Sequence, residues 1–425
     1  MTRNEEGMWE RIFSRGNLIE AMRRVERNKG AAGVDGMEVE ELRPHLMLHW
    51  EKIRAKLDAG EYEPSPVKRV GIPKPDGGER MLGIPTVQDR FIQQAINQVL
   101  MEEYDPKFSD HSYGFRPERS AHDAIRKAEE YIGEGKIWVV DMDMEKFFDR
   151  VNHDRLMSRL KQDIEDKRLL KLINGYLKAG VMVNGVVMGT EEGTPQGGPL
   201  SPLLSNIVLD ELDRELEKRG HSFVRYADDC NIYVRSQRAA ERVLESTRRF
   251  VEKKLRLKVN EEKSAVDLVT KRKFLGFSFY WRTGAIRIRI AEQSLKRIKR
   301  KMKQLTRRNS GQSWAEVSLK LRRAIVGWVN YYALADAKSH MILLDAYLRR
   351  RVRQLIWVQW KTTQNRYRRL VQRHVSSSWA IRMAGSSKGA WRLSNSKPLH
   401  LALDNDYLTR SGLVSFLQQF QLRLT

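Results

Sequence analysis

Two adjacent aspartates, Asp228 and Asp229, interrupt an apolar stretch near the middle of the chain. The segment Phe223 to Val234 has β-branched and aromatic residues on both sides of the pair, which predicts a β-hairpin with the two acids at its turn. Neighbouring carboxylates repel one another unless a cation lies between them, and hard oxygen ligands favour Mg²⁺. A surface turn without any ligand is the alternative, since Asp is common in turns.

A second group of acids follows a predicted strand further upstream. Lys136 to Asp141 is rich in β-branched and aromatic residues, which predicts a short buried strand. Four acids fall within nine residues at its end: Asp141, Asp143, Glu145 and Asp149. At a strand end, one of them is expected to point into an open site. Carboxylates from separate strands fit nucleotidyl transfer, in which two Mg²⁺ ions about 4 Å apart activate a hydroxyl and stabilise departing pyrophosphate.

The elements that must position these acids alternate between strands and helices. Residues 67–72 and 80–84 predict a β-hairpin around a Pro-Asp-Gly-Gly turn, with Lys74 and Arg80 flanking the turn. A loop dense in glycine and proline, residues 193–199, precedes a long helix from about Ser201. Glycines allow backbone to approach a ligand closely. A solvent-exposed hairpin without a ligand is the alternative for residues 67–84.

Other candidate contacts lie in loops and short strands. Arg116, in the polar loop that feeds a helix capped by Ser120, is a candidate phosphate contact, with an ordinary surface arginine as the alternative. Lys263 comes just before one predicted strand, and Phe274 to Phe277 belongs to another, which contains Gly276.

The charge of this 425-residue chain is very unevenly distributed. Residues 1–290 hold 51 Lys and Arg against 48 Asp and Glu, a net of +3, whereas residues 291–425 hold 27 against 6, a net of +21. A basic C-terminal third predicts a surface that binds a polyanion, and nucleic acid fits better than a membrane surface. No apolar run approaches the roughly 18 residues that a membrane span needs. With Cys230 as the one cysteine, we expect a cytosolic protein without disulfides.

Seven sequence blocks, taken in order, resemble reverse transcriptases, and most of all the intron-encoded proteins of bacterial group II introns. The short length and Gly-Trp-Val-Asn-Tyr-Tyr at 327–332 resemble the compact class C branch. The blocks are Ile-Pro-Lys-Pro-Asp-Gly-Gly at 72–78, Tyr-Gly-Phe-Arg-Pro at 113–117, Asp-Met-Glu-Lys-Phe-Phe at 143–148, Thr-Pro-Gln-Gly-Gly-Pro-Leu-Ser-Pro at 194–202, Tyr-Ala-Asp-Asp at 226–229, Asn-Glu-Glu-Lys-Ser at 260–264 and Phe-Leu-Gly-Phe at 274–277.

The resemblance implies a catalytic site and its ligands. Asp143, Asp228 and Asp229 are expected to hold two Mg²⁺ ions, and Asp143 is chosen because it alone precedes the Phe-Phe pair at the family spacing. Phe148 is expected to lie under the incoming sugar and to exclude a 2′-hydroxyl. The remaining expected contacts are Lys74, Arg80 and Gln196 to the nucleotide, Arg116, Lys263, Phe274, Leu275 and Gly276 to the primer and template, and Arg349, Arg350, Arg351 and Arg353 to nucleic acid.

The resemblance also implies an architecture. We expect an α+β, right-hand polymerase fold in four parts: an N-terminal extension (1–60), fingers and palm with an antiparallel sheet (61–290), a helical thumb or maturase domain (291–365) and a small DNA-binding segment (366–425). Many relatives also carry an endonuclease domain built on paired cysteines and histidines, which a chain with one cysteine is not expected to form. The expected partners are an RNA template, intron RNA, a DNA primer or target and deoxynucleoside triphosphates.

The expected function is that of an RNA-directed DNA polymerase that also binds its group II intron RNA and assists splicing and mobility. Two alternatives stay open. One is a splicing cofactor that binds RNA and makes little use of its polymerase site. The other is a domesticated reverse transcriptase in DNA repair or defence. The intact set of acids, together with Phe148, Lys74 and Arg80, argues against the first.

Overall fold

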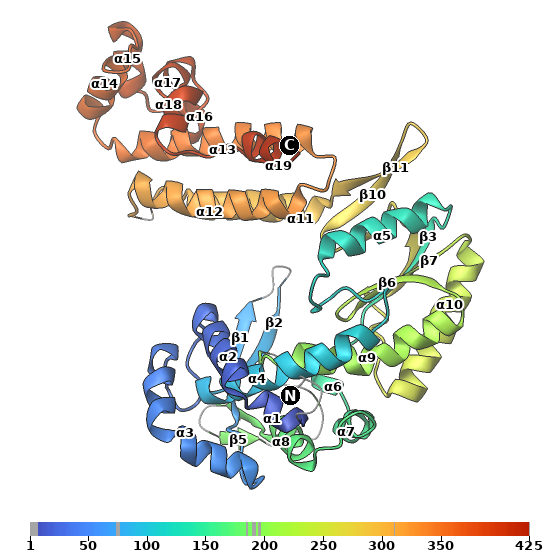
Figure 1. The fold of residues 1–425 in the computed structure, drawn as a ribbon. Coiled ribbons are helices and arrows are strands. Elements are labelled where there is room, and N and C mark those ends of the chain that lie inside the picture. Colours follow the sequence, from blue (N-terminus) through green and yellow to red (C-terminus); the bar gives the residue numbers. More distant parts are fainter. Residues whose placement is uncertain are drawn as a thin grey trace. The chain divides into compact units, whose positions relative to one another are not determined.

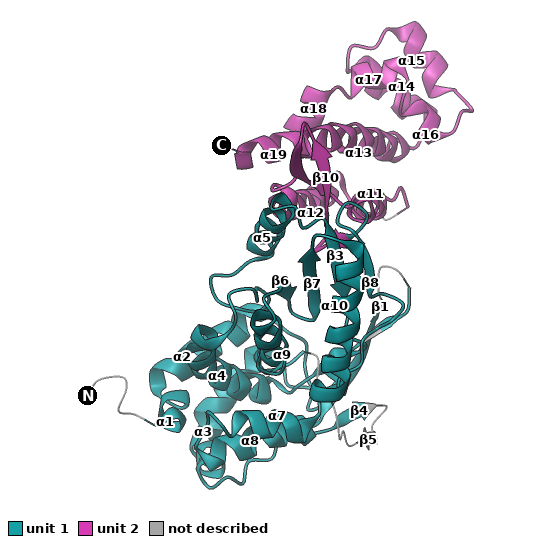
Figure 2. Cartoon of the chain, turned by 90° about the vertical axis from the view of Figure 1, so that its right-hand side faces the viewer, with its two compact units in different colours: residues 1–272 teal, residues 273–425 magenta. Residues whose placement is uncertain are grey.

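The computed structural model describes residues 7–73, 77–183, 186–188, 193, 197–309 and 311–424. Its contacts divide the chain into two compact units, which are described separately (Figure 2). Unit 1 is residues 1–272 and unit 2 is residues 273–425. No helix among the described residues is long and apolar enough to cross a bilayer.

The centre of unit 1 is a four-stranded antiparallel sheet, which we call the palm sheet. Its strand order is β6 (Ser222–Tyr226), β7 (Asp229–Val234), β3 (Trp138–Met142) and β8 (Ala265–Leu268). Three helices pack against it: α5 (Ala121–Gly133), α9 (Ser201–Lys218) and α10 (Gln237–Phe250) (Figure 1). Val140 and Ile232 are paired across β3 and β7 and have no exposed surface, so the middle of the sheet belongs to the core.

A second sheet of unit 1 has the order β2-β1-β4-β5. The pair β1 (Val67–Pro73) and β2 (Glu79–Ile84) is the antiparallel hairpin predicted from the sequence. Strand β4 (Val181–Val183) runs parallel to β1, and β5 (Val186–Met188) is antiparallel to β4. The helix α4 (Val87–Tyr104) follows β2 directly, and the Thr86 hydroxyl caps its first turn by accepting from the Asp89 N–H.

The other helices of unit 1 surround its hydrophobic core. Apolar residues recur at helical spacing along them, and buried side chains from Trp9 to Val259 form one continuous cluster. These helices are α1 (Met8–Ile12), α2 (Arg15–Asn28), η1 (Val39–Glu41), α3 (Leu42–Asp58), η2 (Asp105–Lys107), α6 (Phe147–Arg150), α7 (His153–Leu160), α8 (Lys167–Lys178) and the π-helix η3 (Val251–Leu255).

Unit 2 begins with a small antiparallel sheet and continues as helices. Its sheet has the order β11 (Ala285–Ile290), β10 (Phe277–Arg282) and β9 (Lys273–Phe274). Trp357 and Phe416 are fully buried among the helices. The helices are α11 (Glu292–Leu305), α12 (Trp314–Tyr332), α13 (Lys338–Gln359), α14 (Thr363–Val371), α15 (Ser377–Ala384), α16 (Ala390–Leu393), α17 (Lys397–Ala402), α18 (Asn405–Arg410) and α19 (Phe416–Leu424).

The α+β fold expected from the sequence is confirmed, with an antiparallel sheet in unit 1 and helices dominating unit 2. Residues 273–290 belong to the same compact unit as the helices that follow them. Within that unit, α19 packs on α12 and α13. The finer division into four parts stays a prediction.

Candidate active site

The register of the palm sheet gathers the predicted acids at one end of β3 and β7. Asp228 lies in the turn between β6 and β7, and Asp229 is the first residue of β7. Strands β3 and β7 are antiparallel, with Met142 opposite Cys230. One further step of that register sets Asp143 opposite Asp229, because paired positions move in opposite directions along antiparallel strands. A short strand and a two-residue turn therefore bring together acids that are 85 positions apart in the sequence.

The acids at this end of the sheet influence one another electrostatically. Desolvation and the negative charges of Asp228, Asp143 and Asp141 raise the pKa of Asp229 to about 7. Asp229 is an exposed residue at the start of β7 and is therefore accessible to an ion from solvent. A bound cation would remove the effect of those charges, whereas it would not remove burial. The arrangement is thus suited to a cation.

Asp143 is held in place by the segment just before β8. Its N–H donates to the Ser264 hydroxyl (3.0 Å), and its carbonyl accepts from the Asn260 N–H (2.8 Å). The Lys263 Nζ lies 3.4 Å from the Asp143 Oδ2. The sequence pointed to Lys263 but not to the anchoring roles of Asn260 and Ser264, although both belong to the Asn-Glu-Glu-Lys-Ser block.

Two of the other nearby acids have their own cationic partners. Asp141 forms an ion pair with Arg272, with 2.5 Å between Oδ2 and Nη2. Glu145 forms ion pairs with Arg150 (2.8 Å) and Lys258 (3.0 Å). These ion pairs are shorter than the 3.4 Å between Lys263 and Asp143, and the choice of Asp143 as the metal ligand stays a prediction.

Carboxylate oxygens are the ligands that Mg²⁺ prefers, so the donor chemistry of Asp143, Asp228 and Asp229 fits a divalent metal. Within the described part of the chain, no three acidic, histidine or cysteine side chains are arranged closely enough to ligate one ion as they stand.

Phe148 lies five residues after Asp143, on the short helix α6. It is 8% exposed, and its ring meets Phe147 edge to face, with 5.3 Å between the ring centroids. The glycine-rich loop approaches this helix at Gly193, where a Cβ would lie 2.9 Å from the Phe148 carbonyl oxygen. The buried His153 Nε2 is 2.6 Å from the Gly193 carbonyl and fixes this point of the loop. Sequence reasoning missed His153.

The expected nucleotide contacts are only partly described. Arg80 is opposite Ile72 in the β1–β2 register. Lys74 and Gln196 lie outside the described residues. Gly197, which follows Gln196 in the sequence, is described: a Cβ at this position would come within 2.6 Å of the Gly83 carbonyl oxygen. The glycine-rich loop and β2 are thus in close backbone contact, which explains the glycine at this position.

Arg116 is mostly buried and is engaged within unit 1. Its Nε donates to the Asp105 carboxylate (2.6 Å), and its other nitrogens donate to the carbonyls of Ser109, Ser112 and Asp105. This pattern supports a role in holding residues 105–112 together. Its contact with primer or template stays a prediction.

The expected primer-support strand is not continuous: Phe274 ends β9, Phe277 begins β10, and Leu275 and Gly276 form the turn of a hairpin in unit 2. Phe274 is buried, and the Leu275 carbonyl accepts from the Tyr331 hydroxyl (2.8 Å). Gly276 has φ +82°, and a Cβ there would lie 2.5 Å from the Tyr332 hydroxyl oxygen. A glycine is therefore required by both the backbone conformation and the close approach of α12.

Three of the four arginines expected to bind nucleic acid make contacts inside unit 2. Arg350 stacks over the Trp391 ring at 3.9 Å, and the Arg351 Nε donates to the Thr306 hydroxyl (3.0 Å). Arg353 is 5% exposed, and its Nε donates to the Leu403 carbonyl (2.8 Å). Contact of this cluster with nucleic acid stays a prediction, as does that of Arg349.

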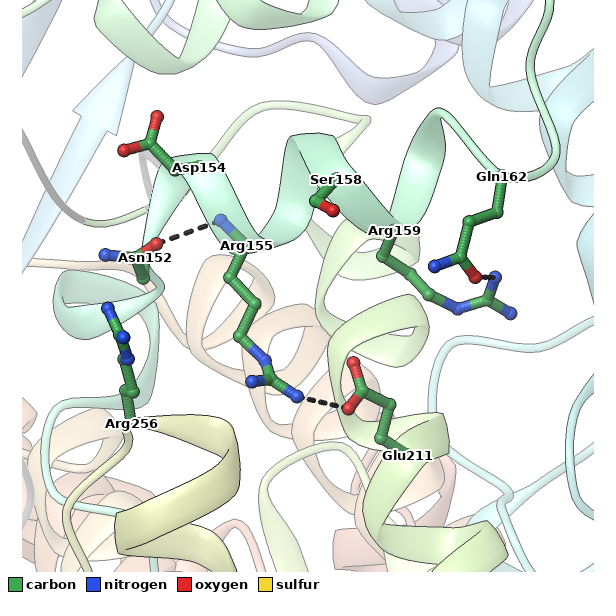
Figure 3. A pocket seen from close by; sticks show the side chains of 8 residues that line it. All are labelled: Asn152, Asp154, Arg155, Ser158, Arg159, Gln162, Glu211 and Arg256. Carbon is green, nitrogen blue, oxygen red and sulfur yellow. Dashed lines mark hydrogen bonds and ion pairs between the residues drawn. The ribbon is translucent and has the colours of Figure 1, made fainter.

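A polar pocket of about 570 Å³ lies elsewhere in unit 1, and none of Asp143, Asp228 and Asp229 lines it (Figure 3). Its wall includes Arg155, Arg159 and Arg256 as well as the acids Asp154 and Glu211. Arg155 forms an ion pair with Glu211 across it. The pocket wall thus carries charges of both signs.

Comparison with known families and proteins gives two family matches. Residues 72–279 match the reverse transcriptase (RNA-dependent DNA polymerase) family, and residues 295–374 match the group II intron maturase-specific domain. The first match covers the end of β1, all of β2, the palm sheet, β9 and the first half of β10. The second covers most of α11, all of α12 and α13, and α14.

Individual relatives agree with these matches. The chain is 35% identical to protein YkfC of Escherichia coli K12 over 289 residues, which is 59% of this chain and 76% of that protein. It is 43% identical over 165 residues to the group II intron-encoded protein LtrA of Lactococcus lactis, covering 39% of this chain and 27% of LtrA. It is 32% identical over 224 residues to the putative COX1/OXI3 intron 1 protein of Saccharomyces cerevisiae, covering 50% and 26%.

The chain thus spans about a quarter of the length of LtrA and of the yeast intron protein. Among solved structures, a partial Cas6-RT-Cas1–Cas2 complex matches 58% of this chain and 43% of its own, with 24% identity and a TM-score of 0.38.

Proposed function

The chain belongs to the reverse transcriptases that carry a group II intron maturase-specific domain, and from this premise we propose that it copies RNA into cDNA by two-metal nucleotidyl transfer. Its enzyme class is RNA-directed DNA polymerase. The observation that carries the proposed mechanism is the convergence of Asp143, Asp228 and Asp229 at one end of the palm sheet. In this proposal the three carboxylates hold two Mg²⁺ ions.

When bound, the metal ions supply Lewis-acid activation of the primer 3′-hydroxyl and charge neutralisation at the leaving pyrophosphate. The protein's own contribution is position. The Ser264 hydroxyl and the Asn260 N–H fix the backbone on both sides of Asp143, and the β6–β7 turn fixes Asp228 and Asp229. The acids are therefore preorganised by contacts of the backbone. They do not hold one another in place, because their negative charges repel.

Nucleotide selection is assigned to residues around the acids. Phe148, buried on α6 beside the glycine-rich loop, is proposed to lie against the sugar and to exclude a 2′-hydroxyl. Lys74 and Arg80, on either side of the β1–β2 turn, are proposed to bind the triphosphate, and Gln196 to contact the nucleotide. Deoxynucleoside triphosphates are the proposed substrates.

Unit 2 carries the charge expected of the nucleic-acid-binding part. It holds 31 Lys and Arg against 6 Asp and Glu, a net of +25, whereas unit 1 holds 47 against 48, a net of −1. We assign to unit 2 the binding of intron RNA, through which the protein assists splicing and mobility. RNA template and DNA primer or target are the further proposed partners.

A primer-extension assay tests the catalytic assignment. With an RNA template, a DNA primer, deoxynucleotides and Mg²⁺, the variants Asp228→Asn and Asp143→Asn should lose at least about 10³-fold in rate while binding RNA as the wild type does, because a metal ligand is removed and the basic surface is not. Asp149→Asn is the matched control, since Asp149 is an exposed acid on the same segment. Near wild-type extension by Asp228→Asn would overturn the assignment.

A further inference from the structure

Arg225 and Asp213 form an ion pair that has no exposed surface, between strand β6 and helix α9. The Arg225 Nε and Nη2 donate to the two oxygens of the Asp213 carboxylate over 2.8 and 2.6 Å. Removing two charges from water is costly, and apolar residues of similar volume often stabilise a fold equally well. Stability alone is thus a weak reason for a pair of this kind.

The remaining donors of Arg225 are directed at the turn that carries the catalytic acids. Its Nη1 donates to the carbonyl oxygen of Ala227 (2.9 Å) and to the Asn206 Oδ1 (3.0 Å), and its Nη2 donates to the Ser112 hydroxyl (2.8 Å). A guanidinium has five N–H donors, and all five are used here. All the N–H donors of the Arg225 guanidinium are thus hydrogen-bonded. These bonds fix its orientation, and one of them holds the carbonyl of Ala227.

The turn itself is held in an unfavourable conformation. Ala227 has φ +57°, in the left-handed region that residues with a Cβ rarely adopt. On its other side, the backbone at Gly114 approaches so closely that a Cβ there would lie 2.3 Å from the Ala227 nitrogen. The Asn206 amide links the two sides, because its Nδ2 donates to the Gly114 carbonyl (2.9 Å) while its Oδ1 accepts from Arg225.

We infer that Arg225 is a positioning residue for the proposed polymerase, because its buried guanidinium holds the Ala227 carbonyl and so fixes the two carboxylates that follow it. The inference rests on the proposed function and deepens it. Ala227 immediately precedes Asp228, so a rotation of the peptide after Ala227 displaces Asp228 and Asp229 together. Asp213, Asn206 and Ser112 serve Arg225 by holding its guanidinium in the orientation that reaches this carbonyl.

The decisive substitution is Arg225→Lys, because a lysine keeps the charge that pairs with Asp213 but cannot reach Ala227, Asn206 and Ser112 at once. Single-nucleotide addition should slow by about 10- to 100-fold, as expected when reacting groups are displaced by about 1 Å. The KM for the deoxynucleotide should stay within about threefold, since the nucleotide contacts are not altered. The Mg²⁺ concentration for half-maximal rate should rise several-fold, which a purely structural role would not cause.

Two further variants keep the test interpretable. Asn206→Ala removes one partner of the guanidinium and should shift the Mg²⁺ requirement in the same direction by a smaller factor; it decides the question if Arg225→Lys does not fold. Tyr62→Phe is the control, because it removes a buried hydroxyl that donates to Asp89 (2.7 Å) in the same unit without touching the turn. It should lower the melting temperature and leave the Mg²⁺ requirement unchanged.

The failure of this inference is distinguishable from failure of the proposed function. A wild-type protein that does not extend primers on RNA contradicts the proposed function. An active wild type whose Arg225→Lys and Asn206→Ala variants keep the wild-type Mg²⁺ requirement overturns the positioning role. The same holds if Tyr62→Phe changes the Mg²⁺ requirement as much as they do, because loss of stability would then explain all three.

Discussion

The ammonium group of Lys263 lies 3.4 Å from the Asp143 Oδ2, at the end of β3 where the proposed catalytic acids converge. Lys263 itself is largely exposed and Asp143 is one-quarter exposed. An exposed ion pair of this kind contributes up to about 1 kcal/mol. A lysine in this position competes with a metal ion for the same carboxylate oxygen.

We therefore expect Lys263→Gln to lower the Mg²⁺ concentration for half-maximal extension by up to about fivefold, the factor that corresponds to about 1 kcal/mol. The melting temperature should hardly change. Lys258→Gln is the matched control, since Lys258 pairs with Glu145 rather than with Asp143. The measurement is the rate of primer extension across a Mg²⁺ titration, and an increased requirement in Lys263→Gln would contradict the competition.

Phe148→Val should weaken discrimination against ribonucleotides. Removing part of the ring opens space beside the 2′ carbon, and interactions of that size are worth about 10- to 200-fold in specificity. The ratio of kcat/KM for dGTP over GTP should therefore fall at least about tenfold. Phe147→Val is the control, because it loses comparable packing but leaves the Phe148 side chain in place. An unchanged ratio in Phe148→Val would remove Phe148 from the proposed role.

The exposed cations of helix α11 should contribute to the salt dependence of RNA binding. Arg297, Lys299 and Lys301 are exposed on this helix. Neutralising all three to Gln should reduce the slope of log affinity against log salt by about 0.7–0.9 for each phosphate that these side chains neutralise. The melting temperature should stay close to that of the wild type. Affinity measured at several salt concentrations checks this, and an unchanged slope would place the RNA on another surface of the protein.

Arg353→Gln should lower the stability of the protein and leave the salt dependence of RNA binding nearly unchanged. Arg353 is 5% exposed and donates to the carbonyl of the buried Leu403 and to the Oδ1 of the exposed Asn405 (3.2 Å), so its removal takes the donor from a buried carbonyl. That costs about 1–3 kcal/mol, which lowers the melting temperature by several degrees. If Arg353 acts mainly within the fold, the salt slope should change by much less than the amount expected for one phosphate. A stable variant with a clearly reduced slope would instead support direct binding of nucleic acid by Arg353.

Acid should destabilise unit 1 in part through His111. Burial lowers the pKa of His111, whose Nδ1 lies 3.0 Å from the Tyr131 hydroxyl. Below the ordinary histidine pKa of about 6.5, the unfolded chain binds a proton that the folded chain does not, so stability falls with decreasing pH. His111→Gln should therefore lose less stability between pH 7 and pH 5 than the wild type. Denaturant unfolding at the two pH values tests this, and an equal loss would contradict it.

The elements around the acids were predictable from local patterns, whereas Asp143 was chosen from its acidic neighbours through the family resemblance. The β-branched and aromatic residues on both sides of Asp228 and Asp229 predicted the hairpin, and the Ser120 capping box was correctly placed. The Gly-Pro loop before Ser201 also predicted the start of α9. These features depend on neighbours in the sequence, which is why a single chain is enough to find them.

Contacts between distant segments were not predictable in the same way. The donors of Arg225 reach residues on three different segments, and nothing about Arg225 in the sequence separates it from a surface arginine. The same reason applies to Arg116 and Arg353, whose hydrogen bonds within the protein were not predictable from the sequence and whose nucleic-acid contacts stay predictions. Burial of a charged residue is a property of the whole fold.

The uneven division of charge between the units bears on translocation. A polymerase must advance its product by one nucleotide in every cycle, so each interaction that holds the product must also be released. Interactions with phosphates are equivalent at every step along a strand, and they allow a protein to slide without losing its hold. Unit 1, with a net charge of −1, adds little attraction to such a backbone, whereas unit 2, with +25, can keep it bound. Retention of the product and its stepwise movement are therefore compatible in one chain.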